Sequence, residues 1–241
     1  MITAPAVPAA EEAMFPAAVY PTEAEDTADK GVFYMKLQYL GHSCFKLSSG
    51  DYSIVVDPYE NGSVPGLRDL DVTANLCLCS HGHGDHHGDS CVTIAESFVR
   101  SPFGIEAVES WHDADCGRKR GTNSIHIFHG EGMKVIHLGD MGCRPENWQM
   151  ELLREADAVM APAGGYYTAE PSVVSEVLKE INPRIVIPMH YRTAVSGFPV
   201  LKTCEEFLSY CSGVVRYETD TLVLNRNSKP HTAVLKQWAC R

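Results

Sequence analysis

The stretch His81-Gly82-His83-Gly84-Asp85-His86-His87 decides both the fold and the chemistry expected of this chain. It places four histidines and one aspartate in seven residues. Imidazole nitrogens and carboxylate oxygens are ligands that suit zinc and related transition metals, and the glycines let the backbone turn tightly enough for neighbouring side chains to converge. A histidine-rich surface loop is the alternative, but the apolar residues 76–79 before the run are typical of a buried strand. The stretch therefore predicts a metal site.

Composition narrows the class of protein. The chain has 241 residues, of which 44% are hydrophobic, enough for one domain with a sizeable core. No run reaches the roughly 18 apolar residues of a membrane helix, and no basic-then-apolar leader is seen, so we expect no membrane association. Nine scattered cysteines, an odd number, favour free thiols and a cytoplasmic location. A formal net charge of −11 argues against long nucleic acid as a partner.

Three segments are expected along the chain. Residues 1–34 are rich in Ala and Pro and carry six acidic residues against one lysine, which indicates a flexible acidic arm; an arm docked at a subunit interface is the alternative. Residues 35–226 form the predicted folded domain, and residues 227–241 a C-terminal tail. The oligomeric state stays open, with a homo-oligomer allowed.

The folded segment has the pattern of a layered α/β domain. Short strand-like runs separated by Gly, Asp, Ser and Pro fill the first half, at 36–40, 44–47, 52–56, 76–79, 105–109, 124–128 and 134–138. Helices are expected at 147–156, 170–180 and 204–210, alternating with strands at 158–160, 184–188, 214–217 and 221–225. This order predicts sheets flanked by helices.

Each candidate ligand follows an apolar strand directly. His81 follows residues 76–79, His112 follows 105–111, Asp140 follows 135–138, and His190 follows 185–189. Loops at the carboxyl ends of separate strands converge on the ligand sites of α/β folds. Four segments that end alike therefore predict one shared site.

These residues resemble the metallo-β-lactamase superfamily. The HxHxDH motif of that superfamily is matched by His81, His83, Asp85 and His86, and Asp57 matches its early buried aspartate. The resemblance covers about residues 35–226. The stretches 41–44 and 162–168 look most like the branch that contains the ascorbate-6-phosphate lactonases. The resemblance implies an αββα four-layer sandwich with a dinuclear metal site at one edge.

The resemblance also assigns ligands to two metal ions. The implied set comprises His81, His83 and His112 for one ion, and Asp85, His86 and His190 for the other, with Asp140 bridging. Two divalent ions are expected as cofactors: zinc suits this donor set, with manganese, iron, nickel or cobalt as competitors. Flavin- and di-iron-dependent relatives usually carry Glu at the position of His83, so the histidine argues for hydrolysis.

The implied activity is metal-dependent hydrolysis. A metal-bridged hydroxide would attack a small ester, lactone or phosphoester, with Asp85 and Asp140 as the catalytic carboxylates. Counting the two metals against these two carboxylates and a hydroxide leaves the site about one unit positive. This local charge predicts an anionic small-molecule substrate in spite of the acidic surface.

Several further residues have two interpretations each. Asp57 would support the ligand loop from behind, as the resemblance implies, and Asp113 could fix a neighbouring imidazole or be a loop acid. His42 follows a strand, so it could line the pocket or be a hydrogen-bonded structural histidine. His87 exceeds the expected ligand number and favours an outer or exposed role. Structural roles are favoured for the remaining histidines of this part of the chain, His126, His129 and His137.

Candidates for substrate contact lie in three loops, which contain residues 118–120, residues 166–167 and Arg192. Arg192, two residues after His190, could bind an anion. The basic cluster 118–120 could do the same, although a solvated loop is favoured for it. Tyr166 and Tyr167 lie on a Gly-rich loop and could either contact substrate or pack within the loop.

Two other functions compete with a small-molecule hydrolase. A phosphodiesterase or nuclease, like the RNA-processing branch of the superfamily, is disfavoured by the acidic composition. A non-catalytic metal-binding or regulatory protein would keep the ligands without turnover. An occluded pocket would favour this last interpretation.

Overall fold

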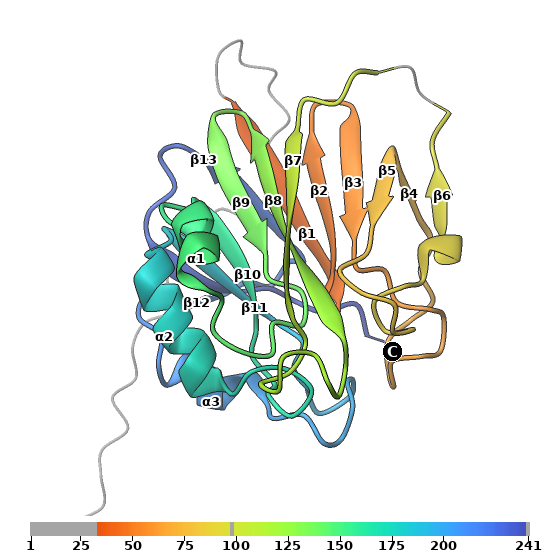
Figure 1. Cartoon of the computed structure of the whole chain (residues 1–241). Coiled ribbons are helices and arrows are strands. Elements are labelled where there is room, and N and C mark those ends of the chain that lie inside the picture. The colour runs from red at the N-terminus through yellow and green to blue at the C-terminus, as the bar shows by residue number, and fades with distance from the viewer. Residues whose placement is uncertain (1–32, 97–98, 240–241) are drawn as a thin grey trace, which may run out of the picture. The chain divides into compact units, whose positions relative to one another are not determined.

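The computed structural model describes residues 33–96 and 99–239 (Figure 1). The predicted arm at 1–34 therefore lies outside the described residues except for its last two. In chain order the elements are β1 Tyr34–Gly41, β2 Cys44–Ser49, β3 Tyr52–Val56, β4 Val72–Ala74, β5 Leu76–Leu78, the 3₁₀ turn η1 Asp89–Cys91, β6 Val92–Ile94, β7 Gly104–Trp111, β8 Thr122–Gly130, β9 Met133–His137, α1 Asn147–Leu153, β10 Ala158–Pro162, α2 Pro171–Ile181, β11 Ile185–Met189, α3 Cys204–Leu208, β12 Val214–Arg216, β13 Thr221–Asn225 and β14 His231–Val234.

Two large sheets form the centre of the fold. One has the strand order β13-β1-β2-β3-β5, and the other the order β12-β14-β11-β10-β9-β8-β7. In the first sheet β1, β3 and β5 run in one direction, because β2 is antiparallel to both β1 and β3, and β5 is parallel to β3. In the second sheet β7, β9, β10 and β11 share a direction. The carboxyl ends of these strands lie at one edge of their sheets.

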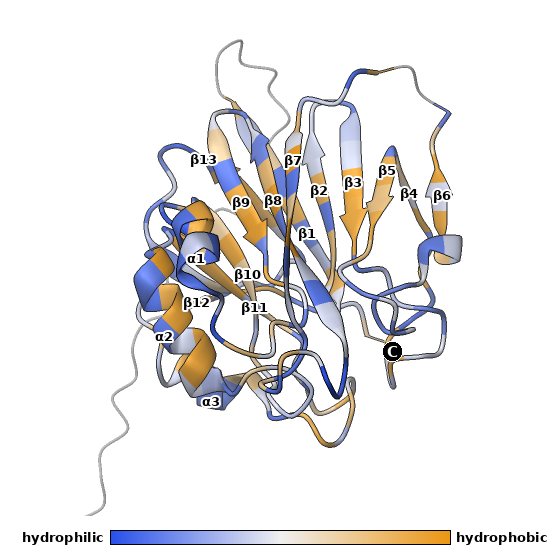
Figure 2. Ribbon diagram, in the orientation of Figure 1, coloured by the Kyte–Doolittle hydropathy of each residue, from blue (hydrophilic) through white to orange (hydrophobic). Residues whose placement is uncertain are grey.

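The core between the two sheets follows from the two-residue repeat of the strands. In β10, Ala158 and Met160 face the other sheet, whereas Val159 and Ala161 face the helices. The opposing strand β1 contributes Leu37 with its neighbours Met35 and Tyr39 to the same inner layer. β10, which is covered on both faces, is therefore apolar throughout, and Figure 2 shows it as mostly hydrophobic, whereas β1 alternates and leaves Lys36 exposed.

The helices cover the outer face of the seven-stranded sheet. α2 begins with Pro171, whose missing N–H is harmless in the first turn. Its buried stripe includes Val174, Val177 and Ile181, spaced so that one face of the helix meets the sheet. The chain leaves α2 through Asn182 in the left-handed conformation, with φ 55°. α1 and α3 join the same apolar layer.

The outer face of the five-stranded sheet is covered differently from the expected αββα pattern. Leu40 and Val55 pack there against Tyr59 and Leu67 and against residues of the two-stranded sheet β4–β6. Within 33–96 and 99–239, this layer contains the 3₁₀ turn η1 but no α-helix. The fold is a mixed α/β sandwich of two sheets with few helices, as expected, and one of its outer layers is built from loops and short strands.

The folded domain extends past the predicted boundary at residue 226. β14 lies between β11 and β12 and is parallel to both, so the segment 227–241 supplies a strand of the seven-stranded sheet. A four-residue strand after a polar loop gives too short a repeat to be recognised in the sequence. In the described part of the chain, no helix has the length and apolar character needed to cross a membrane.

Candidate metal centre

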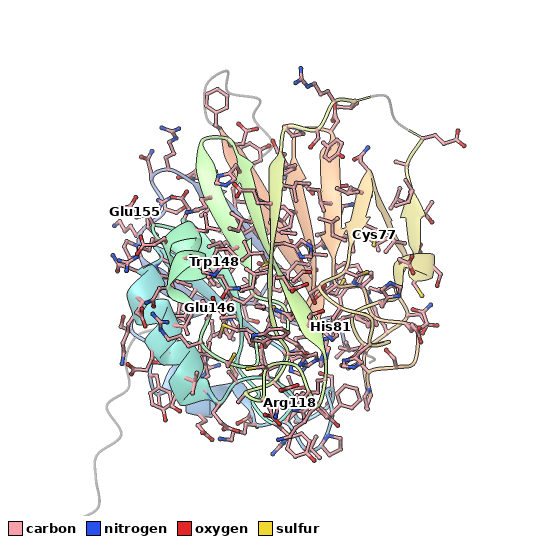
Figure 3. All side chains as sticks on the ribbon, in the orientation of Figure 1. Cys77, His81, Arg118, Glu146, Trp148 and Glu155 are labelled. Carbon is pink, nitrogen blue, oxygen red and sulfur yellow. The ribbon has the colours of Figure 1, made fainter. Side chains whose placement is uncertain are left out.

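The carboxyl ends of four strands bring the predicted ligands to one place, and a fifth strand brings the predicted supporting residue Asp57. Asp57 follows β3, His81 follows β5, His112 follows β7, Asp140 follows β9, and His190 follows β11. Because these strands run in common directions within their sheets, their ends meet at one edge, where Figure 3 labels His81. The turn after β1 adds His42 from the five-stranded sheet.

Strained backbone marks this edge. His42, Asp57 and His190 have φ angles of 52°, 49° and 53°, in the left-handed region that side-chain-bearing residues rarely adopt. Gly139 has φ 56°, and a Cβ there would lie 2.2 Å from Oδ1 of Asn123. The chain thus turns sharply at the ends of four strands, at residues that belong to the site or, in the case of Gly139, directly precede Asp140. Strain of this kind is concentrated at functional sites.

The side chains form overlapping groups whose ligand atoms lie within 4.8 Å of one another. These groups are His81, His83 and His112; His42, Asp85, His86 and His190; and His81, His86 and Asp140. The first two correspond to the two ligand sets that the resemblance implies, with His42 added to the second. The structure therefore brings together all seven predicted ligands.

Hydrogen bonds fix which ring nitrogen faces the centre. His86 Nδ1 lies 2.8 Å from Oδ2 of Asp57, so this nitrogen carries the proton and donates it. His81 Nδ1 lies 2.9 Å from Oγ of Ser80, which donates to Oδ2 of Asp57 at 2.6 Å. In both rings Nε2 is left for the interior of the site. A carboxylate behind a histidine is the usual support of a metal-binding imidazole.

Close approaches of nitrogen and oxygen atoms in the centre fit a shared cation. His112 Nε2 lies 3.2 Å from Nδ1 of His83. Two nitrogens on one tetrahedral zinc, each at about 2.05 Å, lie roughly 3.3 Å apart. Asp140 Oδ1 lies 3.2 Å from Nε2 of His86, and Asp140 Oδ2 lies 3.2 Å from Nε2 of His190 and 3.5 Å from Nε2 of His112.

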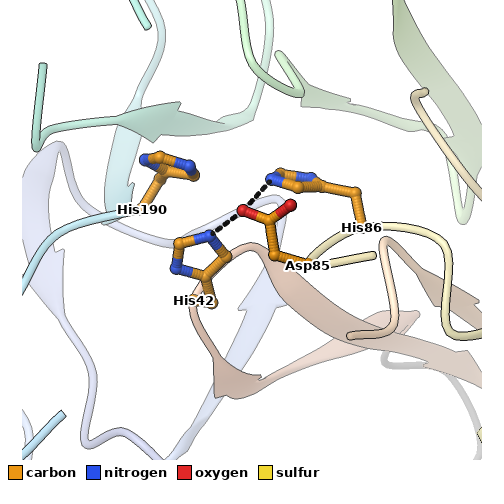
Figure 4. A group of neighbouring side chains, drawn as sticks. All are labelled: His42, Asp85, His86 and His190. Atoms are coloured by element: carbon orange, nitrogen blue, oxygen red, sulfur yellow. Dashed lines mark hydrogen bonds and ion pairs between the residues drawn. The ribbon is translucent and has the colours of Figure 1, made fainter. Parts of the chain in front are cut away.

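The second group is drawn in Figure 4, where His42 and His86 approach the same carboxylate. Asp85 Oδ2 lies 3.1 Å from Nε2 of His42 and 3.8 Å from Nε2 of His86. The His42 ring packs on the ring of His190 with 4.1 Å between centroids. His42 is therefore part of the cluster, and its Nε2 donates to Asp85 when that nitrogen is protonated.

Unpartnered buried atoms show that the cluster is built for a ligand. In residues 33–96 and 99–239, ten buried side-chain nitrogen or oxygen atoms have no hydrogen-bond partner, and seven of them belong to this cluster. They are His42 Nδ1, His81 Nε2, His86 Nε2, His112 Nδ1, Asp140 Oδ1 and both ring nitrogens of His190. A buried polar atom without a partner costs about 1–3 kcal/mol. This donor set fits transition-metal ions, because a bound cation would satisfy atoms that the protein leaves unpaired.

Protonation in the metal-free protein agrees with that interpretation. Burial lowers the pKa of His42 to about 4 and that of His81 to about 3, so both rings are neutral near pH 7 and keep a lone pair for a metal. Burial also opposes a charge on His86, but Asp140 and Asp57 outweigh it and raise its pKa. In the metal-free protein a proton on His86 thus provides positive charge between the two carboxylates.

Two residues hold the Asp140 loop: Asn123, which was not predicted as part of the site, and His137, for which a structural role was predicted. Asn123 accepts the N–H of Asp140 at 2.8 Å and donates to the carbonyl of Leu138 at 2.9 Å. His137 donates through Nε2 to the carbonyl of Ser43 at 2.8 Å, which joins the two sheets below the site. A polar residue inside an apolar strand pattern was the available signal at both positions.

Of the two interpretations of Asp113, the structure agrees with the loop acid and shows no hydrogen bond from its carboxylate to an imidazole among the described residues. Its carboxylate accepts four backbone N–H groups of the following loop, from Asp115, Gly117, Lys119 and Arg120, at 2.8–3.2 Å. Burial alone would raise the pKa of Asp113, but these amide hydrogen bonds outweigh it and lower the pKa. Asp113 therefore shapes the loop after His112.

A cavity of about 310 Å³ opens over the cluster. Its lining comprises His83, Asp85, His112, Arg120, Asp140, Tyr167 and Phe198. Tyr167 is the member of the predicted tyrosine pair that reaches it, whereas Tyr166 is 56% exposed and absent from the lining. Arg192 does not line it either: its Nε donates to the carbonyl of Leu201 at 2.7 Å, and it borders a separate cavity of about 530 Å³.

The other histidines lie away from the ligand groups. His87 is exposed beside the ligand run. His126 is buried in β8 opposite His137 of β9. His129 is exposed and forms an ion pair with Glu106 at 3.0 Å.

Comparisons with known proteins agree with this geometry. A family described as "Beta-lactamase superfamily domain" matches residues 36–190. A UPF0173 metal-dependent hydrolase of Desulforamulus reducens is 30% identical over 194 residues, which cover 66% of this chain and 85% of that protein. A UPF0173 metal-dependent hydrolase of Bacillus cereus is 28% identical over 232 residues, which cover 79% of this chain and all of that protein.

A solved structure from Thermotoga maritima is similar as well. It is a candidate Zn-dependent hydrolase of the metallo-beta-lactamase superfamily, 31% identical, with a TM-score of 0.64 over 84% of this chain and 99% of that one. The metallo hydrolase Igni18 of Ignicoccus hospitalis, 21% identical, has a TM-score of 0.58 over 80% of this chain and 99% of its own. The second likeness concerns the fold alone.

Proposed function

Because this chain belongs to the metallo-β-lactamase superfamily of metal-dependent hydrolases, we propose that it is a dinuclear hydrolase of a small ester, lactone or phosphoester. The observation that carries the proposal is the position of Asp140 between the two ligand groups. One oxygen of its carboxylate approaches His86, and the other approaches both His112 and His190. A carboxylate in contact with both groups is suited to bridge two ions.

The ligand chemistry favours zinc as the metal. His81, His83 and His112 would hold one ion, while Asp85, His86 and His190 would hold the other, with Asp140 shared. Donors dominated by imidazole with few carboxylates suit zinc, and manganese, iron, nickel or cobalt are the competitors. When bound, the metals would lower the pKa of a water molecule and polarise the substrate oxygen.

Other side chains around the site would accept a proton, position the metals and limit the access of water. Asp85 lines the cavity, and its carboxylate can accept a proton from the attacking water while His42 holds one of its oxygens. Asp140 is only 2% exposed, so it acts from the floor of the site. Phe198 and Tyr167 form an aromatic wall, with 5.9 Å between ring centroids, that limits water at one side of the cavity.

The cavity supports catalysis on a small molecule. Its volume of about 310 Å³ is at the lower end of the range for ligand pockets, about 300–1,000 Å³. It reaches Asp85 and Asp140, whereas a metal-binding protein without turnover would not need such an opening. The chain's net charge of −11 supports a small substrate over a long nucleic acid. The resemblance to ascorbate-6-phosphate lactonases supports lactones as the first substrates to test.

We also propose that the protein is located in the cytoplasm. All eight cysteines in the described part of the chain are free thiols, which supports a reducing compartment such as the cytoplasm.

The test combines metal content with hydrolysis. Protein reconstituted with zinc is assayed on 4-nitrophenyl acetate, glucono-δ-lactone and bis(4-nitrophenyl) phosphate, alongside Asp85→Asn and His129→Gln. His129 is an exposed histidine away from the ligand groups, which makes it the matched control. We expect turnover of at least one class, a loss of about 100-fold or more in kcat for Asp85→Asn, and wild-type activity for His129→Gln. Turnover of none, or equal turnover by Asp85→Asn, would contradict the proposal.

A further inference from the structure

Arg120 is the basic residue of the cavity. Four of the seven lining residues, His83, Asp85, His112 and Asp140, belong to the ligand groups. The other three are Arg120, Tyr167 and Phe198, so the rest of the lining combines one cation with two aromatic rings. A ligand in this cavity would therefore meet the metal ligands, a guanidinium and an aromatic surface.

The guanidinium of Arg120 has no acidic partner among residues 33–96 and 99–239. Its central carbon lies 5.5 Å from the centroid of the Tyr167 ring, a cation–π contact. The neighbouring Arg118, in contrast, has a side chain that is 79% exposed and pairs with Asp115 at 3.6 Å. An unpaired arginine beside a cavity keeps its donors available for a ligand.

The backbone that carries Arg120 is fixed in place. The Arg120 N–H donates to Oδ2 of Asp113 at 2.8 Å, and the N–H of Lys119 donates to the same oxygen at 3.0 Å. The N–H of His112 donates to the carbonyl of Gly121 at 3.1 Å, which closes the loop back onto the metal ligand. The distance between Arg120 and the metal centre is thus set by backbone hydrogen bonds that any substitution of the Arg120 side chain would preserve.

We propose that Arg120 binds an oxyanionic group of the substrate, a carboxylate or a phosphate, while Tyr167 and Phe198 pack against its apolar or ring portion. This inference rests on the proposed function and names the substrate class for the same site. The guanidinium presents paired donors that match the geometry of a carboxylate or phosphate. The small cavity requires the anionic group to lie close to the reacting bond.

Charge balance makes the recognition depend on metal loading. Without metals, the carboxylates of Asp85 and Asp140 face the same cavity as Arg120 and would repel an anion. Bound divalent ions offset those carboxylates and leave Arg120 to attract the anion. The test therefore uses the zinc-loaded protein.

The test measures binding of two probes that a hydrolase cannot cleave. Isothermal titration calorimetry with phenylphosphonate and with benzoate compares the zinc-loaded wild type, Arg120→Gln, Arg120→Lys and Lys119→Gln. Lys119 is exposed on the same loop and does not line the cavity, so its variant controls for general charge. Zinc content and circular dichroism are recorded for each variant.

We expect Arg120→Gln to weaken binding of at least one probe by about tenfold or more, the size of one lost charge-assisted hydrogen bond. Arg120→Lys should lie in between, because it keeps the charge without the paired donors, and Lys119→Gln should bind as the wild type does. A loss confined to phenylphosphonate assigns a phosphate, and a loss confined to benzoate assigns a carboxylate.

Two results would overturn the inference: binding of both probes by Arg120→Gln as tightly as by the wild type, or no probe binding by the wild type. Failure of the proposed function is seen separately, in the wild-type hydrolysis assay. If the wild type hydrolyses a substrate and Arg120→Gln binds both probes as the wild type does, only this inference is contradicted. If Arg120→Gln loses about tenfold in probe binding and the wild type hydrolyses no substrate, only the proposed function is contradicted.

Discussion

Replacing Asp57 by asparagine should disable one metal ligand without changing the size of any side chain in the site. Asp57 is fully buried, and its Oδ1 accepts the N–H of Ser80 at 2.6 Å. Its Oδ2 accepts the hydroxyl of Ser80 at 2.6 Å and the Nδ1–H of His86 at 2.8 Å. In Asp57→Asn, the amide oxygen is required by the Ser80 N–H, which leaves the NH₂ group facing His86.

The consequence is a change of tautomer. Facing a donor, Nδ1 of His86 becomes the acceptor, and the ring proton moves to Nε2, the nitrogen that points toward Asp140. That nitrogen then has no lone pair for a metal. Loss of a supporting partner typically lowers metal affinity by about 10–100-fold, equivalent to about 1.4–2.7 kcal/mol. We expect a loss at or above the upper end of this range at the ion that His86 binds.

The assay is zinc titration in competition with a fluorescent chelator, with thermal unfolding as a check of the fold. Asp157→Asn is the matched control, because Asp157 also accepts a backbone N–H, that of Lys134 at 2.7 Å, and pairs with Arg184 at 2.6 Å away from the site. The control should bind zinc as the wild type does. A folded Asp57→Asn protein with zinc affinity within about twofold of the wild type would refute the reasoning.

Three further substitutions test separate parts of the structure. Ile187→Ala should lower the free energy of unfolding by about 2–5 kcal/mol, because it leaves a void between the two sheets at a fully buried position; urea denaturation measures this, and a loss below about 1 kcal/mol would contradict the packing. His42→Ala removes the partner that holds Asp85 at 3.1 Å, so the zinc content after dialysis should fall from about two ions per chain toward one, whereas retention of both would count against a positioning role. Asn123→Ala leaves the N–H of Asp140 without its acceptor, at a cost of about 1–3 kcal/mol. Because this hydrogen bond holds Asp140 in place for the metals, zinc affinity should also weaken by about tenfold in chelator competition, and an unchanged affinity would show that the Asp140 loop does not need this support.

Much of the metal site could be predicted from sequence because its ligands occupy recognisable local positions. His81 and His86 lie in one short run, where spacing alone brings side chains together. His112, Asp140 and His190 each follow an apolar strand, and strand direction then places them at a common edge. These signals depend on local sequence and on a general rule about strand ends.

Other site features depend on contacts that no local pattern encodes. His42 reaches Asp85 only because the turn after β1 brings it beneath the end of β11, where its carbonyl accepts the N–H of His190 at 2.7 Å. The Asp113 carboxylate could have bound an imidazole ring or its own loop. It binds its own loop, because four backbone N–H groups of that loop converge on it. Whether Arg120 or Arg192 reaches the cavity depends on how each loop is rotated, which composition does not determine.

The fold shows the same division between local and tertiary information. The strands and helices with a clear apolar repeat, such as β10 and α2, lie close to the predicted ranges. β14 was missed because its four residues become a strand through pairing with β11 and β12. The outer layer over the five-stranded sheet was expected to be helical, but between residues 57 and 75 the chain is held by contacts such as the hydroxyl of Tyr59 donating to the carbonyl of Arg68 at 2.9 Å.

The metal content of the purified protein tests the central claim most directly. Elemental analysis of protein prepared without chelator or a histidine tag, and then loaded with zinc, should give about two ions per chain. His112→Ala, which removes a ligand of one group, should give about one. No bound metal in the wild type after loading, or an unchanged content in His112→Ala, would contradict a dinuclear centre built from these residues.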